Sequence, residues 1–124
     1  MPFTYHQSSG ILVFPDGAQM VRCYSGIGPG LDNPAEQSVP NMGPIPVGTY
    51  RVGSAFDHPQ CGPLTMRLTP EPGTDTFGRD GFCIHGDTGA MNHTASHGCI
   101  VVAPGPRAMI AREQQQDNLL NVAP

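Results

Sequence analysis

Two short segments of the chain decide the fold, Gly81-Phe82-Cys83-Ile84-His85 and Gly98-Cys99-Ile100-Val101-Val102. Each begins with a glycine and continues with apolar or alternating side chains, a pattern that predicts a short, buried β-strand. Residues 88–94 between them are small and polar, which predicts a loop. Such a loop can bring the ends of the two strands, and therefore His85 and Cys99, close together.

The rest of the chain predicts further short strands and one helix. The strand-like stretches lie around Tyr5 and at residues 10–14, 20–24, 47–52, 63–68 and 119–122. Pro15-Asp16-Gly17 predicts a hairpin turn, and alternation places Leu64, Met66 and Leu68 on one strand face. A helix is predicted over 107–114, with Pro106 in its first turn. Residues 25–46 predict an irregular, functional loop.

Composition limits the architecture and the partners. A chain of 124 residues suits one domain, so residues 1–124 are expected to form a single unit. Sixteen glycines and 14 prolines beside 38% hydrophobic residues favour a compact, loop-rich, mostly β domain. The net charge is −4 and all six basic residues are scattered arginines, which argues against nucleic acid as a partner.

Membrane and export signals are absent from the sequence pattern. No apolar run is long enough to cross a bilayer, and residues 1–10 lack a charged region followed by an apolar one. We therefore expect no Sec-type signal and, if the protein works outside the cytoplasm, export by another route.

Cys99 has the surroundings expected of a nucleophile. A cysteine attacks a carbonyl as the thiolate, which needs a nearby base, and His85 and His97 are the two candidates. The backbone N–H groups of Gly98 and Cys99 could form an oxyanion hole. A base also needs an orienting group on its other ring nitrogen, which could be the carbonyl of Gly86 or the carboxylate of Asp87.

These residues resemble the signature of the L,D-transpeptidases: His85-Gly86, a spacer, and then Ser96-His97-Gly98-Cys99. Residues 43–50 resemble the strand entry found upstream in these enzymes. Further blocks resemble a compact branch of the family, the antibacterial effectors delivered by type VI secretion systems: Ser25-Gly26, Asn33-Pro34, Leu68-Thr69-Pro70 and Phe77-Gly78-Arg79. The resemblance covers residues 4–122.

The resemblance implies a fold, a reaction and partners. The fold would be a mostly β sandwich or open barrel with one short C-terminal helix, forming one L,D-transpeptidase-like catalytic domain. Cys99 would attack the meso-diaminopimelate carbonyl of a peptidoglycan tetrapeptide stem and expel D-Ala, with His85 as base and His97 shaping the site. Ser96 would brace the turn. Water or a D-amino acid would resolve the thioester, and no cofactor or metal would be needed.

An effector of this branch would use type VI secretion machinery, act in the periplasm of the target cell and be blocked by a cognate immunity protein.

Two departures from the family pattern affect the expected reaction. The spacer is short, and Val101 stands where a polar residue often follows the motif, which favours trimming or exchange of stems over cross-linking. Arg79 is a candidate for binding a substrate carboxylate, because a guanidinium matches that group.

Other interpretations stay open at this stage. Cys83, His85, His93, His97 and Cys99 supply the ligand types of a zinc site, although their spacing fits no common pattern. A non-catalytic wall-binding domain is a second alternative. Cys23 and Cys61 could form a disulfide in an oxidising compartment. Cys83 shares a strand face with His85, but a buried structural thiol is its simpler role.

Overall fold

The computed structural model describes residues 2–59, 61–86 and 98–124, which form a strongly curved sheet with one α-helix. The strands in chain order are β1 (Phe3–His6), β2 (Ile11–Val13), β3 (Met20–Arg22), β4 (Tyr24–Ser25), β5 (Gly48–Val52), β6 (Phe56–His58), β7 (Gly62–Pro70), β8 (Cys83–His85), β9 (Ile100–Val101) and β10 (Leu119–Ala123). The helix α1 spans Pro104–Glu113, and two short 3-10 helices, η1 (Gly28–Gly30) and η2 (Pro34–Glu36), follow β4.

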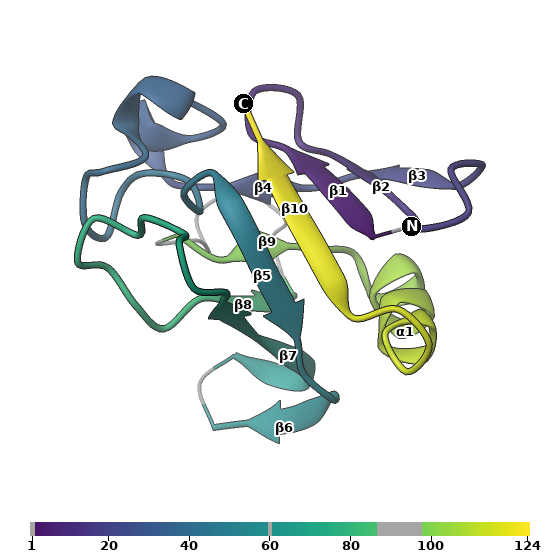
Figure 1. Cartoon of the computed structure of the whole chain (residues 1–124). Helices are drawn as coiled ribbons and strands as arrows, with labels where there is room; N and C mark the ends of the chain where they lie inside the picture. The colour runs from purple at the N-terminus through teal and green to yellow at the C-terminus, as the bar shows by residue number, and fades with distance from the viewer. Residues whose placement is uncertain (1, 60, 87–97) are drawn as a thin grey trace.

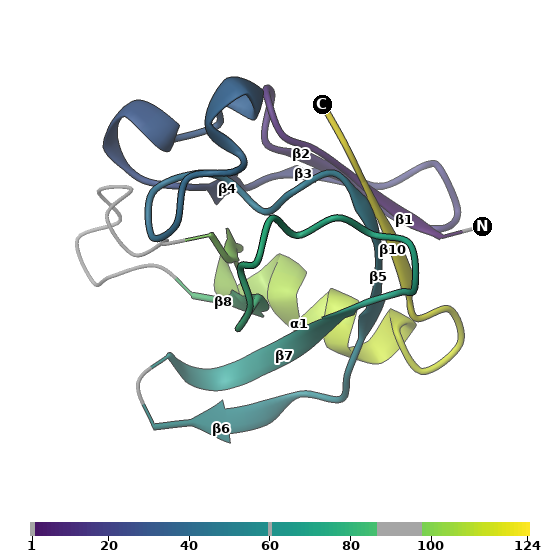
Figure 2. The same cartoon turned by 60° about the vertical axis from the view of Figure 1, so that its left-hand side comes forward.

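The sheet closes nearly into a barrel. Its strand order is β3-β2-β1-β10-β5-β7-β8-β9-β4, with β6 paired to β7 outside this path. Strands β3 and β4 lie at opposite ends of that order, yet only Cys23 separates them in the chain. One residue can connect the two edges only if the edges approach each other, so the sheet must curl, as Figures 1 and 2 show.

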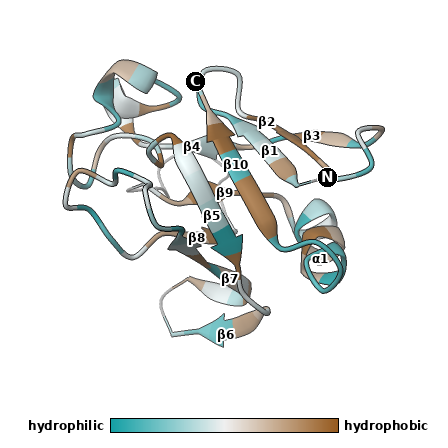
Figure 3. Ribbon diagram, in the orientation of Figure 1, coloured by the Kyte–Doolittle hydropathy of each residue, from teal (hydrophilic) through white to brown (hydrophobic). Residues whose placement is uncertain are grey.

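Alternation along the strands builds the core inside this curl. Phe3 and Tyr5 of β1 and Leu120 and Val122 of β10 are buried, while their neighbours along each strand are less so. The same apolar cluster takes in side chains from other strands, from the segments beside them and from α1: Leu12, Phe14, Ile45, Tyr50, Val52, Met66, Leu68, Phe82, Ile84, Ile100, Val102 and Ile110. Figure 3 shows this pattern as hydrophobic colour along most of β10.

The structure confirms the mostly β fold and the single C-terminal helix expected from the sequence. The turn after Phe14 is present, with the Phe14 N–H bonded to the Gln19 carbonyl and Gly17 at φ +74°. Residues 119–122 do form a closing strand, β10, which pairs in parallel with β1 and antiparallel with β5. No helix in the described part of the chain has the length and apolar character needed to cross a membrane.

Three details differ from the sequence-based expectations. The predicted strand over 20–24 is interrupted at Cys23, where the chain changes from one sheet edge to the other. Leu64 does not share a face with Met66 and Leu68, because its φ of +56° breaks the alternation where β6 joins β7 irregularly. The helix begins at Pro104, two residues before the predicted first turn, and β6 was not predicted.

Candidate active site

The candidate site lies where β8 and β9 run in parallel. Ile84 pairs with Ile100 and His85 pairs with Val101 in this register. Ile84 and Ile100 point into the apolar core, so Cys83 and His85 lie on the opposite face of β8. His85 therefore lies diagonally across from Cys99, two residues before its partner on the neighbouring strand. Cys83 and His85 are nevertheless only 4% and 5% exposed.

His85 is held by its own strand end. Its Nδ1 lies 2.7 Å from the carbonyl oxygen of Gly86. A carbonyl only accepts, so Nδ1 carries the proton in neutral His85, and the lone pair is on Nε2. Gly86 is thus one of the two orienting groups that the sequence analysis left open, while Asp87 lies outside the described residues. This tautomer is the one that lets Nε2 act as a base.

The backbone before Cys99 depends on glycine. Gly98 has a φ of +130°, and a Cβ at this position would come within 3.0 Å of the Arg79 guanidinium. Both facts exclude larger residues without a shift of Arg79 or of the backbone. Cys99 follows as a partly exposed residue, and its Sγ lies 3.7 Å from the carbonyl oxygen of Gly81. The chain thus places Cys99, which is more exposed than Cys83, at the start of β9.

A second thiol contacts the candidate nucleophile. Cys83 and Cys99 are hydrogen-bonded through their side chains, and this bond lowers the pKa of Cys83 to about 7, assisted by the charge of Arg67 and opposed by burial. The same bond raises the pKa of Cys99, to which burial and the charge of Cys83 add. Cys99 is therefore the donor and Cys83 the acceptor when the pair carries one negative charge.

Arg79 fastens a distant segment to the site. The residue is 9% exposed, and its Nη1 donates to the carbonyl oxygens of Gln37 and, at 2.9 Å, Pro44. Its Nη2 donates to the Gly43 carbonyl at 3.0 Å, and the guanidinium lies 5.5 Å from the ring centroid of Phe82. Backbone carbonyls thus occupy the fork that the sequence analysis assigned to a substrate carboxylate. This geometry favours a bracing role.

Two further polar residues support the site: Ser25, which the sequence indicated only as part of a resembling block, and Arg107, which was not predicted to take part. The Ser25 hydroxyl is fully buried, accepts from the Ile45 N–H at 2.8 Å and donates to the Gly98 carbonyl at 3.4 Å. Arg107 of α1 donates to the Val102 carbonyl at 2.8 Å and packs against Gly86. The two Ser25 contacts join residues 20 and 73 positions apart in the chain, so local sequence patterns do not reveal them.

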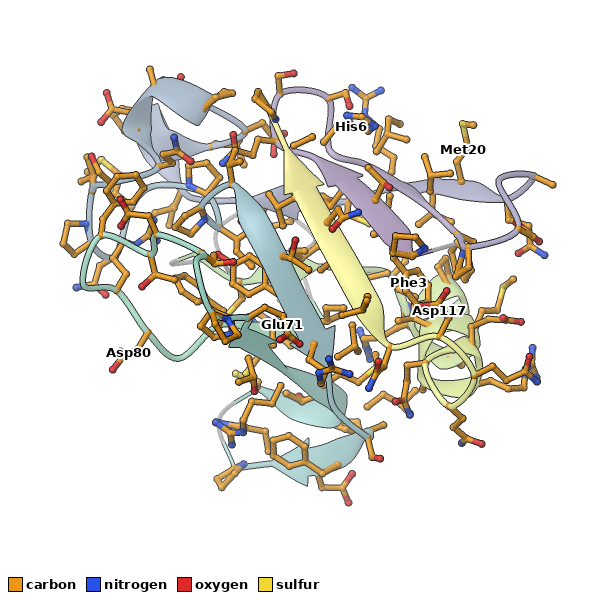
Figure 4. All side chains as sticks on the ribbon, viewed as in Figure 1. Phe3, His6, Met20, Glu71, Asp80 and Asp117 are labelled. Carbon is orange, nitrogen blue, oxygen red and sulfur yellow. The ribbon has the colours of Figure 1, made fainter. Side chains whose placement is uncertain are left out.

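A small pocket lies beside Arg79 and the backbone segment that its guanidinium holds. It has a volume of about 250 Å³ and is lined by Pro40, Asn41, Gly78, Arg79 and Asp80. Its walls come from the two segments that Arg79 joins, and Asp80 points outward from the loop before β8 (Figure 4).

Several predicted residues cannot be placed. Asp87, Ser96 and His97 lie outside the described residues, as does His93 of the alternative zinc set. Within residues 2–59, 61–86 and 98–124, no group of three or more His, Cys, Asp or Glu side chains could hold a metal ion.

The cysteines are distributed differently from the pairing considered above. All four are free thiols. Burial raises the pKa of Cys61, and the charge of the nearby Cys83 adds to this shift. Cys23 instead lies near Asp32, whose charge adds to burial in raising the pKa of Cys23 to about 12. Cys61 therefore lies near the thiols of the candidate site, whereas Cys23 lies near Asp32 instead.

Comparison with known proteins identifies a family. The Tlde1 domain matches residues 19–123, most of the chain. A comparison with curated proteins found no match.

Solved structures share the fold. The helical cell shape determining protein Pgp2 from Campylobacter jejuni superposes with a TM-score of 0.62 at 19% identity, covering 97% of this chain and 46% of that one. L,D-transpeptidase 1 from Mycobacterium tuberculosis superposes with a TM-score of 0.58 at 14% identity, covering 98% of this chain and 58% of that one. The chain thus spans about half the length of these proteins, and the likeness establishes an L,D-transpeptidase-like fold.

Proposed function

The chain belongs to the Tlde1 domain family, and we propose that it is a cysteine-dependent L,D-carboxypeptidase and L,D-transpeptidase acting on peptidoglycan tetrapeptide stems. One observation carries the proposal. Cys99, a partly exposed thiol at the start of β9, lies diagonally across from His85, whose Nδ1 is held by the Gly86 carbonyl at 2.7 Å. A reachable thiol beside a histidine of fixed tautomer is the arrangement that nucleophilic acyl transfer requires.

The first half-reaction forms a thioester. His85 Nε2 accepts the Cys99 proton, and the thiolate attacks the meso-diaminopimelate carbonyl that is bonded to the terminal D-Ala. The backbone N–H groups of Gly98 and Cys99 are the donors we assign to the resulting oxyanion. The carbon–nitrogen bond then breaks, His85 returns its proton to the leaving amine, and D-Ala departs.

The second half-reaction releases the stem. Water, or the amine of a D-amino acid, gives a proton to His85 and attacks the thioester carbonyl. The carbon–sulfur bond breaks and the Cys99 sulfur recovers the proton. Water yields a tripeptide stem, and a D-amino acid yields an exchanged tetrapeptide.

The pocket beside Arg79 and the 37–46 segment can hold the rest of the peptide stem. The pocket beside Arg79 adjoins Gly98 through the guanidinium, and Asp80 is one of its lining residues. We assign this pocket to part of the peptide, with Arg79 shaping it through the 37–46 segment.

The test is the identity of the products. Tetrapeptide-rich peptidoglycan is incubated with the wild type, His85→Ala and His6→Ala, with and without an isotopically labelled D-amino acid, and the muropeptides are identified by mass spectrometry. His6 is the matched control because it lies on β1, well separated from Asp80 and the loop before β8 (Figure 4). The wild type and His6→Ala should yield tripeptides or labelled tetrapeptides, and His85→Ala should not. Intact stems in the wild-type digest would favour a wall-binding module instead.

We further propose that the chain is an antibacterial effector, exported by type VI secretion machinery, active in the target periplasm and neutralised by a cognate immunity protein. The match to the Tlde1 domain supports this role. Expression with an added periplasmic signal sequence should lyse or deform host cells, while cytoplasmic expression and periplasmic Cys99→Ala should not. Equal toxicity from either compartment would oppose the assignment.

A further inference from the structure

The thiol that contacts the candidate nucleophile has no role in the proposed acyl transfer. Cys83 lies in β8 and Cys99 one residue before β9, so continuing the register of these parallel strands back by one residue places them opposite each other. Their side chains are hydrogen-bonded, and the backbone of Cys83 is also hydrogen-bonded to the Cys99 sulfur. Two separate contacts therefore join this pair of residues.

The strand geometry suits a covalent bond between them. Neighbouring strands lie about 4.7–4.9 Å apart. Disulfides join Cα atoms that are about 4.4–6.8 Å apart, a range that includes this spacing. Side chains at paired positions of parallel strands leave the same face of the sheet, which points both sulfurs in one direction. The two side chains are also close enough to influence each other's ionisation.

The two thiols differ in solvent exposure, and this difference sets the order in which they react. Cys99 is partly exposed, whereas Cys83 is only 4% exposed. A reagent from solvent therefore meets Cys99 first, and Cys83 can act only on what Cys99 has become. A reachable thiol beside a buried partner is the arrangement of an attacking and a resolving cysteine.

We propose that Cys83 and Cys99 form a reversible disulfide site that reacts with small-molecule disulfides, with Cys83 as the resolving thiol. Cys99 gives its proton to His85 and, as the thiolate, attacks one sulfur of the reagent, forming a mixed disulfide and releasing one thiolate. The Cys83 thiolate then attacks the Cys99 sulfur, forming the Cys83–Cys99 bond and releasing the second thiolate. The two cysteines lose two electrons and two protons, and the reagent is reduced to two thiols.

This reaction would remove the nucleophile from use. An oxidised chain would be inactive until a thiol reductant restored it, and this consequence rests on the proposed function. The disulfide also protects Cys99, because the bond to Cys83 replaces exposed adducts and further oxidation of the sulfur. Cys61, near both thiols, is the competing partner that the test has to separate.

The experiment oxidises the purified chain in a series of glutathione redox buffers, traps free thiols by alkylation and digests with trypsin without reductant. Cys83 and Cys99 share the tryptic peptide 80–107, and Cys61 lies in the peptide 52–67. The wild type should yield peptide 80–107 with two hydrogens lost and no adduct, and cyanogen bromide cleavage after Met91 should leave its halves linked. Cys61→Ala should behave identically.

The resolving role is tested by removing Cys83. Cys83→Ala, with the closer isostere Cys83→Ser as a second variant, should instead retain one glutathione on Cys99. The proposal is overturned if peptide 80–107 of the wild type retains glutathione or is linked by a disulfide to peptide 52–67. It is also overturned if the wild type stays reduced in a redox buffer in which Cys99 of the Cys83→Ser variant is modified. These readouts need no peptidoglycan, so they stand or fall apart from the proposed activity. If that activity exists, oxidation should abolish it and dithiothreitol should restore it.

Discussion

Replacing Arg79 by methionine is expected to detach the 37–46 segment from the nucleophile. The guanidinium donates to three backbone carbonyls, those of Gln37, Gly43 and Pro44, and lies over the ring of Phe82. Methionine fills a similar length but cannot donate, so the three carbonyls lose their partner.

The expected cost follows from these contacts. A buried acceptor left unpaired costs about 1–3 kcal/mol, and a desolvated cation–π contact contributes about 1–2 kcal/mol. Water can replace the donor at the Gln37 carbonyl, which is only partly buried. We therefore expect a loss of about 3–5 kcal/mol, equivalent to a fall in Tm of roughly 12–20 °C for a domain of this size. Arg79→Lys, which keeps the charge and loses the fork, should fall in between.

The assay combines thermal unfolding with the kinetics of D-Ala release. Arg51→Met is the matched control: Arg51 bonds Glu71 at 2.6 Å, but its side chain is 53% exposed, so its loss should cost less than about 1 kcal/mol. If Arg79 instead held a substrate carboxylate, Arg79→Met would raise KM while unfolding stayed at the wild-type temperature. That result would refute the bracing role.

Three other perturbations have defined outcomes. Gly98→Ala should lower stability by about 1–3 kcal/mol and D-Ala release by about a hundredfold, because the backbone is strained and the nucleophile displaced; a wild-type rate would contradict this. Thiolate absorbance of the wild type should rise through a midpoint near pH 7 as Cys83 ionises, and Cys99→Ala, which removes the donor, should move that midpoint upward; an unchanged midpoint would exclude the thiol hydrogen bond. Ser25→Ala should cost about 1–3 kcal/mol in urea denaturation, because the buried Ile45 N–H loses its acceptor; a loss below about 0.5 kcal/mol would show that water replaces it.

Local patterns made the strands predictable. The alternation in β1 and β10, the turn after Phe14 and the glycine-led segments around β8 and β9 each depend on residues near one another in the chain. The interruption at Cys23 was not predictable in this way. It arises because the sheet curls until its edges meet, which is a property of the whole strand order.

The same distinction between local and long-range contacts applies to the candidate site. The motif indicated Cys99 and His85 as candidates, and adjacent residues suggested that the Gly86 carbonyl could orient His85. The brace from Arg79 to the 37–46 segment joins loops that are 35 or more residues apart, and the contact between Cys83 and Cys99 depends on the pairing of β8 with β9. The sequence indicated that Cys83 shares a face with His85, but not the strand register that places Cys99 opposite Cys83.

The central claim is that Cys99 is the nucleophile of an L,D-acyl transfer, and release of D-Ala from a purified tetrapeptide stem tests it most directly. The measurement compares the wild type, Cys99→Ala and Cys61→Ala, the last removing a neighbouring thiol that the reaction does not use. Cys99→Ala should reduce release by at least about a thousandfold while Cys61→Ala keeps most of it. Release by folded Cys99→Ala at the wild-type rate would contradict the claim.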